Sequence, residues 1–371
     1  MARVRVLDKP EDYKRLGLNP DHVEQWEDGR RSAHKAGVFE NIYFDSIMDD
    51  GTKAVVNFLP HNPRLQTQDD EDHPNLNIHI TTPDGKTYTD VLSYTAEESS
   101  MSTEKCDFQF GPNSFVGDLK EYDIHVEPVN GVGADLHFSV GVKPFRPGTG
   151  YVEFDEDPDL FYTWLVFPSG KVTGTVTAGG KTWEVSGTGY HDHQWPSTNV
   201  MNIWHHWLWG RQTLDNYIVL IFDLVANAKY DFERAPIFAV LDKKGNVVFE
   251  NLNVEDHEHK FEIIERHVQE QTGKTYPKDS RYTFKDHGKT IVFDAKWTQE
   301  LEVRDAGSIF AKNDPKMKEK LHKMGLDPTY TRYQAEGTLS ITDENGHNET
   351  DSGDMIYEFP YLGLPDDRAQ L

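Results

Sequence analysis

The chain of 371 residues contains a single cysteine, Cys106. One cysteine cannot form an internal disulfide, and it cannot supply the several thiolates of a cysteine-rich zinc site. Cys106 lies in Lys-Cys-Asp-Phe-Gln-Phe, which is typical of a strand, so we expect a buried thiol rather than a nucleophile. The lack of disulfides agrees with a reducing compartment.

Long apolar runs and basic residues are also scarce. No apolar run approaches the roughly 18 residues of a membrane-spanning helix, and the N-terminus lacks the apolar stretch of a signal peptide. These absences predict a soluble, cytoplasmic protein without a transmembrane segment. With 63 acidic against 38 basic residues, the formal charge is −25, which repels phosphate backbones and anionic headgroups. Nucleic acid is therefore not expected as a partner.

Three common catalytic motifs are missing from the sequence. It has no Gly-x-Ser-x-Gly, no phosphate-binding loop and no dinucleotide fingerprint. The sequence therefore gives no support for a hydrolase or kinase function.

What the sequence does contain is a long succession of strand patterns. Residues 136–142 alternate apolar and polar side chains, which predicts a strand with one buried face. Residues 217–222 are apolar throughout, which predicts a strand buried on both faces. Such segments recur every 8 to 12 residues or so, about the spacing of antiparallel sandwiches and barrels.

The predicted fold is therefore all-β, with two successive antiparallel halves that meet near residues 205–215. The predicted domain limits are an N-terminal extension over 1–35, a first domain over 36–210 and a second domain over 211–371.

Few and short helices are expected. One begins with Asp21 as its cap and ends near Gly29. The other has Asp314 as its cap and Pro315 at its first position, and Gly325 stops it.

Chemically versatile side chains concentrate between Gly187 and Arg211. This stretch holds four of the 17 histidines and four of the eight tryptophans. One interpretation is a core, with buried tryptophans and hydrogen-bonded histidines. The other is a pocket in which aromatic walls hold an apolar ligand while His or Asp handles its protons. The spacing of the residues shifts the balance toward the pocket.

Residues 190–193 extend a predicted strand that begins at Trp183. Because side chains alternate along a strand, His191 and His193 should share one face about 6–7 Å apart, and Asp192 should share the other with Tyr190. The His-Asp-His triplet has three possible roles: a metal-ligand pair, an acid–base site and a structural pair.

Each role makes a different demand. A metal site would need a third ligand, but adjacent His205 and His206 face opposite ways and no carboxylate is correctly placed, so no metal is predicted. In an acid–base site, burial among indoles would raise the pKa of Asp192, whose protonated carboxyl could deliver a proton to an alkene. A histidine beside it would orient it or take a proton back. In a structural role, Asp192 would hydrogen-bond Arg211 or the backbone and lock the junction of the two halves.

The end of the stretch is also predicted to be a strand with two rows of side chains. One row can line a cavity while the other packs, and which row does which stays open. The rows are Trp204, His206 and Leu208 on one face, and His205, Trp207, Trp209 and Arg211 on the other.

The segment Gly-Thr-Gly-Tyr-His-Asp-His-Gln-Trp at 187–195, followed by Trp-Leu-Trp-Gly-Arg at 207–211, resembles the signature of the carotenoid 1,2-hydratase family. This family is also called hydroxyneurosporene synthase or AttH-like, and it includes fungal lipocalin-like Diels–Alderases and kievitone hydratase. Supporting similarity lies in Glu-Asn-Ile-Tyr-Phe-Asp at 40–45, in 110–115 and in 146–148.

The resemblance implies two lipocalin-like β-barrel or sandwich domains with a hydrophobic pocket at or near their junction. It also implies chemistry on isoprenoid double bonds or polyenes, without a metal or an organic cofactor. The chain departs from the family pattern at Asn41 and Ile42, where aromatic residues are usual, and at Pro196, where glycine is usual. The first departure widens or reshapes one wall of the pocket.

The predicted function is a cofactor-independent hydratase, isomerase or cyclase of a small hydrophobic substrate. Asp192 is the predicted proton donor, His191 or His193 orients it or activates water, and Tyr190 completes the catalytic set. The alternatives are a lipocalin-like carrier without catalysis and a pericyclase that tolerates loss of Asp192. The oligomeric state is not predicted. The predicted substrate-binding residues are Tyr43, Trp195, Trp204, His206, Trp207, Trp209 and Arg211.

Overall fold

The computed structural model describes residues 3–35, 37–61, 70–308 and 316–369, and most of them lie in strands. The chain divides into two compact units. The eleven-stranded unit consists of Leu7–Glu153 and Asp157–Asn199, and the nine-stranded unit consists of Met1–Val6, Phe154–Glu156 and Val200–Leu371. The all-β prediction is confirmed. The domain limits predicted from the sequence, 1–35, 36–210 and 211–371, remain a separate prediction.

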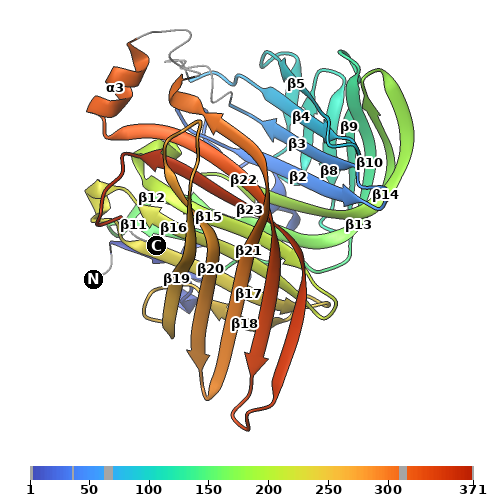
Figure 1. The fold of residues 1–371 in the computed structure, drawn as a ribbon. Helices are drawn as coiled ribbons and strands as arrows, with labels where there is room; N and C mark the ends of the chain where they lie inside the picture. Colours follow the sequence, from blue (N-terminus) through green and yellow to red (C-terminus); the bar gives the residue numbers. More distant parts are fainter. Residues whose placement is uncertain (1–2, 36, 62–69, 309–315, 370–371) are drawn as a thin grey trace. The chain divides into compact units, whose positions relative to one another are not determined.

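Within the described residues, eleven strands form one antiparallel sheet in the order β5-β4-β3-β2-β14-β13-β10-β9-β8-β7-β6. The sheet curls so that one face becomes its interior (Figure 1). Its strands are β2 (Asn41–Met48), β3 (Lys53–Leu59), β4 (Asn75–Thr81), β5 (Thr87–Ser93), β6 (Ser99–Met101), β7 (Asp107–Phe110), β8 (Asn113–Gly117), β9 (Glu121–Val126), β10 (Val132–Val140), β13 (Leu165–Ala178) and β14 (Lys181–Gln194).

A second antiparallel sheet of nine strands is described after residue 200, in the order β18-β17-β16-β15-β23-β22-β21-β20-β19. Its β16 is buried along nearly its whole length, as the apolar run predicted. Its strands are β15 (Trp204–Thr213), β16 (Tyr217–Ala226), β17 (Arg234–Asp242), β18 (Val247–Asn251), β19 (Glu258–Val268), β20 (Thr275–Asp286), β21 (Lys289–Asp305), β22 (Leu326–Thr342) and β23 (Asn348–Gly363). Three short strands lie outside the two large sheets: β1 (Val4–Val6), β11 (Tyr151–Phe154) and β12 (Asp157–Thr163).

The described helices are few and short, as expected: α1 (Pro10–Leu16), η1 (Gln25–Asp28), η2 (Val200–Asn202), η3 (Ala228–Tyr230) and α3 (Met317–Lys323). The prediction of Asp21 as a cap is wrong. The helix before Gly29 is a single 3-10 turn whose cap is Glu24, because Glu27 bonds back to the backbone N–H of Glu24 at 2.8 Å. The caps predicted at Asp314 and Pro315 lie outside the described residues.

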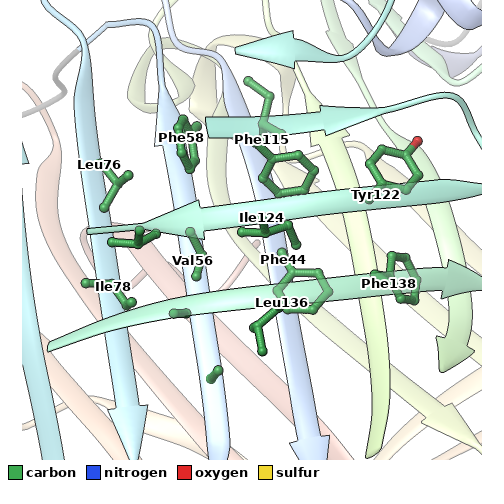
Figure 2. Packing of buried hydrophobic residues seen from close by; sticks show 14 of the residues in the cluster. Phe44, Val56, Phe58, Leu76, Ile78, Phe115, Tyr122, Ile124, Leu136 and Phe138 are labelled. Carbon is green, nitrogen blue, oxygen red and sulfur yellow. The ribbon is translucent and has the colours of Figure 1, made fainter. Parts of the chain in front are cut away.

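The interior of the eleven-stranded sheet is filled by alternate side chains of its strands. The ring of Phe44 meets Phe138 and Phe115 edge-on, with centroids 5.5 and 6.5 Å apart. Such edge-to-face contacts are a preferred packing of aromatic rings. Figure 2 shows this core, which includes Phe44, Val56, Phe58, Leu76, Ile78, Phe115, Tyr122, Ile124, Leu136 and Phe138. Cys106 is buried against the same core, as predicted, although β7 begins one residue later.

The first glycine of the signature, Gly187, allows β14 to lie close to β2. A Cβ atom at this position would lie 2.3 Å from the carbonyl oxygen of Ile47 and 2.5 Å from Cα of Met48. Both are backbone atoms of the neighbouring strand, so a side chain can be accommodated only if the two strands separate.

Gly187→Ala should therefore lower the free energy of unfolding by about 1–3 kcal/mol, as overpacking does in other cores. Urea unfolding followed by circular dichroism measures the change. Gly141→Ala is the matched control, because the nearest neighbours of its Cβ, Cα of Gly170 and the carbonyl oxygen of Ser169, would lie 3.6 Å away. Equal stability of the two variants would contradict the close-approach argument.

Candidate functional site

Strand β14 lies between β2 and β13, and this position gives its two faces different surroundings. Asp192 pairs in register with Tyr43 of β2 and with Val166 of β13. His191 contacts the rings of Phe115 and Phe167, which belong to the interior core. The predicted alternation is confirmed. His191 and His193 point to the interior, and Asp192 and Tyr190 lie on the opposite, outer face.

On the outer face, three donors hold the carboxylate of Asp192. The hydroxyl of Tyr190 and the indole N–H of Trp164 donate to Oδ2 at 2.7 and 3.1 Å. The side-chain amide of Gln194 donates to Oδ1 at 3.1 Å. Tyr162 in turn donates its hydroxyl to the amide oxygen of Gln194. Asp192 is only 1% exposed, so both carboxylate oxygens are fixed in a site shielded from bulk solvent.

Burial raises the pKa of Asp192 to about 6. The hydrogen bonds from Tyr190 and Trp164 favour the carboxylate and oppose this shift, but burial outweighs them. Burial, together with the nearby charge of Asp192, also raises the pKa of Tyr162, which stays a neutral donor. The outer face thus holds a carboxyl group that is easier to protonate than an exposed one.

Tyr43 lies on the same outer face as Asp192. Its ring meets that of Tyr190 edge-on at 6.2 Å between centroids, and its hydroxyl donates to Oδ2 of Asp45 at 2.9 Å. Of the predicted substrate-binding residues, Tyr43 is the one that the eleven-stranded unit places beside the catalytic candidates Tyr190 and Asp192.

The inner face of β14 carries a buried ionic cluster, formed by Asp28, Glu40, His191 and His193. His191 Nε2 lies 3.3 Å from Oδ1 of Asp28, and His193 Nδ1 lies 3.3 Å from the same oxygen. His193 Nε2 lies 2.8 Å from Oε1 of Glu40. All four side chains are fully buried. Neither histidine is hydrogen-bonded to Asp192, so the histidine partner predicted for Asp192 is wrong, because side chains of adjacent strand residues point to opposite faces.

The charges of this cluster stabilise one another. Burial alone would lower the pKa of His193, but the contacts with Asp28 and Glu40 outweigh burial and raise it to about 9. Burial alone would raise the pKa of Asp28 and of Glu40. His191 and His193 lower that of Asp28, and hydrogen bonds from His193, Ser32 and the backbone of Arg31 lower that of Glu40. Two buried carboxylates are therefore tolerated here because imidazoles face them.

Asp28 and Glu40 are not among the functional residues predicted from the sequence. Asp28 lies in the segment interpreted as an N-terminal extension, and nothing in its local pattern distinguishes it from other acidic residues. Glu40 opens the segment 40–45 that resembles the family, but the segment by itself does not indicate a histidine partner for Glu40. The backbone N–H groups of Arg31 and Ser32 donate to Glu40 at 2.8 and 3.0 Å, which fixes its carboxylate toward His193.

Trp195 lies with the inner face rather than with Asp192. Its ring is 4.7 Å from that of His193 and 6.1 Å from that of Tyr151, and its backbone N–H donates to the hydroxyl of Thr163 at 2.9 Å. Trp195 and Trp164 line a cavity of about 10 Å³, enough for one water molecule and too small for a polyene.

The remaining predicted pocket residues lie on β15 of the nine-stranded unit. A bulge between Trp204 and His206 interrupts the alternation at the start of this strand. His205 Nδ1 and His206 Nδ1 are 2.7 Å apart, and both rings contact Tyr361. The prediction that His205 and His206 face opposite ways is therefore wrong, because the bulge adds a residue to one side of the ladder.

The rest of β15 alternates. His206 and Leu208 face the interior of the nine-stranded sheet, where His206 packs on Phe359. On the opposite face of β15, Trp207 packs against Phe222, and the ring centroids are 6.3 Å apart. Trp204 packs on Phe154 at 4.9 Å. Trp209 and Arg211 are buried. A chamber between the two β halves, and the Asp192–Arg211 pair, stay predictions.

No described helix has the length and apolar character needed to span a bilayer. No protein-family model matches the chain. A curated relative, the quinolone epoxide rearrangement protein asqO of Emericella nidulans, is 27% identical over 129 residues. This match spans a third of the length of each protein, 33% in both cases.

Three solved structures share the fold over nearly their whole length. An AttH protein (NE1406) of Nitrosomonas europaea has a TM-score of 0.61 and 13% identity, with 92% of this chain and 98% of that chain covered. CghA with Sch210972 has a TM-score of 0.60 and 12% identity, with 97% and 99% covered. Kievitone hydratase of Nectria haematococca has a TM-score of 0.57 and 14% identity, with 96% of both covered. The predicted likeness to the lipocalin-like AttH and kievitone hydratase family is confirmed at the level of the fold.

Proposed function

We propose that this chain is an enzyme that adds water to, isomerises or cyclises an apolar isoprenoid or polyene substrate, with Asp192 as the proton donor. The observation that carries the proposal is the burial and hydrogen bonding of the Asp192 carboxyl group. It is buried on the outer face of β14, held at both oxygens and surrounded by Tyr190, Trp164 and Tyr162. Its raised pKa adds support.

The proposed reaction begins with transfer of the Asp192 proton to one carbon of a double bond, which leaves a carbocation. The resulting carboxylate is already stabilised by the donors on Tyr190, Trp164 and Gln194. In hydration, water adds to the cation and returns one proton to Asp192. In isomerisation or cyclisation, a neighbouring C–H bond gives the proton back. The acid is regenerated in every case, so the reaction requires no cofactor.

The surrounding aromatic residues have a role in the same proposal. Ring faces stabilise a cation that forms beside them. We assign Tyr43, which lies beside Tyr190, to substrate binding, and Tyr190, Trp164 and Gln194 to positioning of the acid. A substrate-binding role for Trp195, Trp204, His206, Trp207, Trp209 and Arg211 stays a prediction from the sequence. His191 and His193 contact Asp28 and Glu40 instead of Asp192, so they support β14 from its other face.

The relatives support this reaction class by their names. Kievitone hydratase is named for hydration, and CghA was solved with the small molecule Sch210972. The asqO protein is named for an epoxide rearrangement, a reaction that also begins readily with acid at the substrate.

Turnover in D2O tests the proposal. The purified chain is incubated in D2O with a panel of acyclic isoprenoids and conjugated polyenes, and products are analysed by mass spectrometry and NMR. We expect a product with one solvent-derived deuterium on carbon. Turnover without deuterium on carbon would indicate a pericyclase and contradict the acid role. Binding without turnover of any member of the panel would favour a carrier and contradict catalysis.

A further inference from the structure

We propose that the interior of the eleven-stranded unit contains a divalent metal site, suited to zinc, with Asp28, Cys106 and His191 as ligands. The three residues come from separate parts of the chain: Asp28 ends η1, Cys106 precedes β7, and His191 lies in β14. One ligand atom of each lies within 4.8 Å of the other two. Carboxylate, thiolate and imidazole are the groups that bind zinc in proteins.

The distances around Asp28 fit a shared ion better than direct hydrogen bonds. His191 Nε2 lies 3.3 and 3.4 Å from the two carboxylate oxygens. Charge-assisted N–H···O bonds are about 2.7–2.9 Å long. Two ligands that each lie about 2.0–2.1 Å from a tetrahedral ion are roughly 3.3–3.4 Å apart.

The atoms turned away from the proposed ion have the partners that metal ligands require. His191 Nδ1 donates to the backbone carbonyl of Tyr43 at 2.7 Å, which directs the Nε2 lone pair toward Asp28. The hydroxyl of Tyr122 donates to Asp28 Oδ2 at 2.6 Å and leaves Oδ1 for the ion. Histidines bound to metal characteristically donate their second N–H to a carbonyl or a carboxylate.

His193 supplies an independent observation. Its ring is fully buried, and Nε2 is bonded to Glu40, yet Nδ1 has no hydrogen-bond partner although it points at Asp28 from 3.3 Å. A buried nitrogen without a partner is costly. An ion at Asp28 Oδ1 would lie close to this nitrogen, although His193 is outside the set of three ligands that share the site.

The site is closed. Asp28, Cys106 and His191 are each at most 1% exposed, and the rings of Phe115 and Phe167 cover His191. Closed, four-coordinate sites are structural rather than catalytic. The ion would tie η1 and the chain before β7 to β14. The reaction proposed at Asp192 does not use it, so each proposal can fail without the other.

The single cysteine makes the test direct. The full chain is expressed in minimal medium with added Zn2+ or Co2+, because a buried site fills as the protein folds. We expect about one metal ion per chain by elemental analysis, as in other structural sites. We also expect a thiolate-to-cobalt charge-transfer band, which only Cys106 can produce. A folded protein with neither metal nor band would overturn the proposal.

Variants locate the ion. Cys106→Ser should abolish the charge-transfer band, and His191→Gln should lower the zinc content at least tenfold. His205→Gln is the matched control, a buried histidine of the nine-stranded unit, and should change neither. Wild-type zinc content in folded Cys106→Ser and His191→Gln, or its loss in His205→Gln, would overturn the proposal. Should the first two variants not fold, the cobalt spectrum of the unaltered chain decides alone.

Discussion

Asp192→Asn is expected to reduce turnover by about 10²- to 10⁴-fold, the usual contribution of a general acid. The amide has the shape of the carboxyl group but cannot deliver a proton to an alkene. Its oxygen can still accept the hydrogen bonds that Tyr190 and Trp164 now make with Oδ2. Its NH2 group would face the amide donor of Gln194, which should cost about 1 kcal/mol of stability.

The measurement compares kcat of the two proteins on a substrate found in the D2O screen, beside their thermal unfolding. Asp135→Asn, which alters an exposed carboxylate of β10 in the same unit, is the control and should leave both unchanged. Tyr190→Phe removes one donor and keeps the acid, so its loss of kcat should be smaller than that of Asp192→Asn. Full activity of Asp192→Asn would eliminate the acid role and favour a pericyclase.

Asp28→Asn is expected to lower the free energy of unfolding by about 3–5 kcal/mol, as the loss of one partner of a buried ion pair does. Asp28 faces both His191 and His193 inside the sheet, and the hydroxyl of Tyr122 donates to it. The amide can still accept from Tyr122 but cannot balance the charge of His193, whose pKa is raised to about 9. No other single carboxylate in this cluster contacts both histidines.

Urea unfolding with a constant m-value measures this loss. Asp21→Asn is the control, because Asp21 lies seven positions earlier in the same segment but is exposed, and its effect should stay within about 0.5 kcal/mol. A change of less than about 1 kcal/mol in Asp28→Asn would show that the cluster does not depend on this charge.

The fold was predictable because its information is local. Alternation in segments such as β10 and the continuous apolar run of β16 specify which strand faces are buried, and turn residues separate them. The same two-residue period placed His191 and His193 on one face of β14 and Asp192 on the other. These predictions needed only neighbouring residues.

The partners of these side chains were not predictable in the same way. Asp28 precedes His191 by 163 positions, and Glu40 precedes His193 by 153. Residues so far apart in the sequence meet only when the sheet curls and closes. Such contacts leave no periodic pattern in the sequence. The bulge at Trp204–His206 is a second example, because the inserted residue is defined by pairing with β16 rather than by its own type.

The opposite chemistry of the two faces of β14 has a consequence for insertions and deletions. Deleting Gly189 would turn Asp192 toward Phe115 and Phe167 and send the imidazoles outward, because every later side chain of the strand would change sides. Removing two would restore the sidedness yet offset each group from its counterpart on β2. The side chain of Asp192 and the buried contacts of His191 and His193 therefore depend on the same register of β14 with its neighbours.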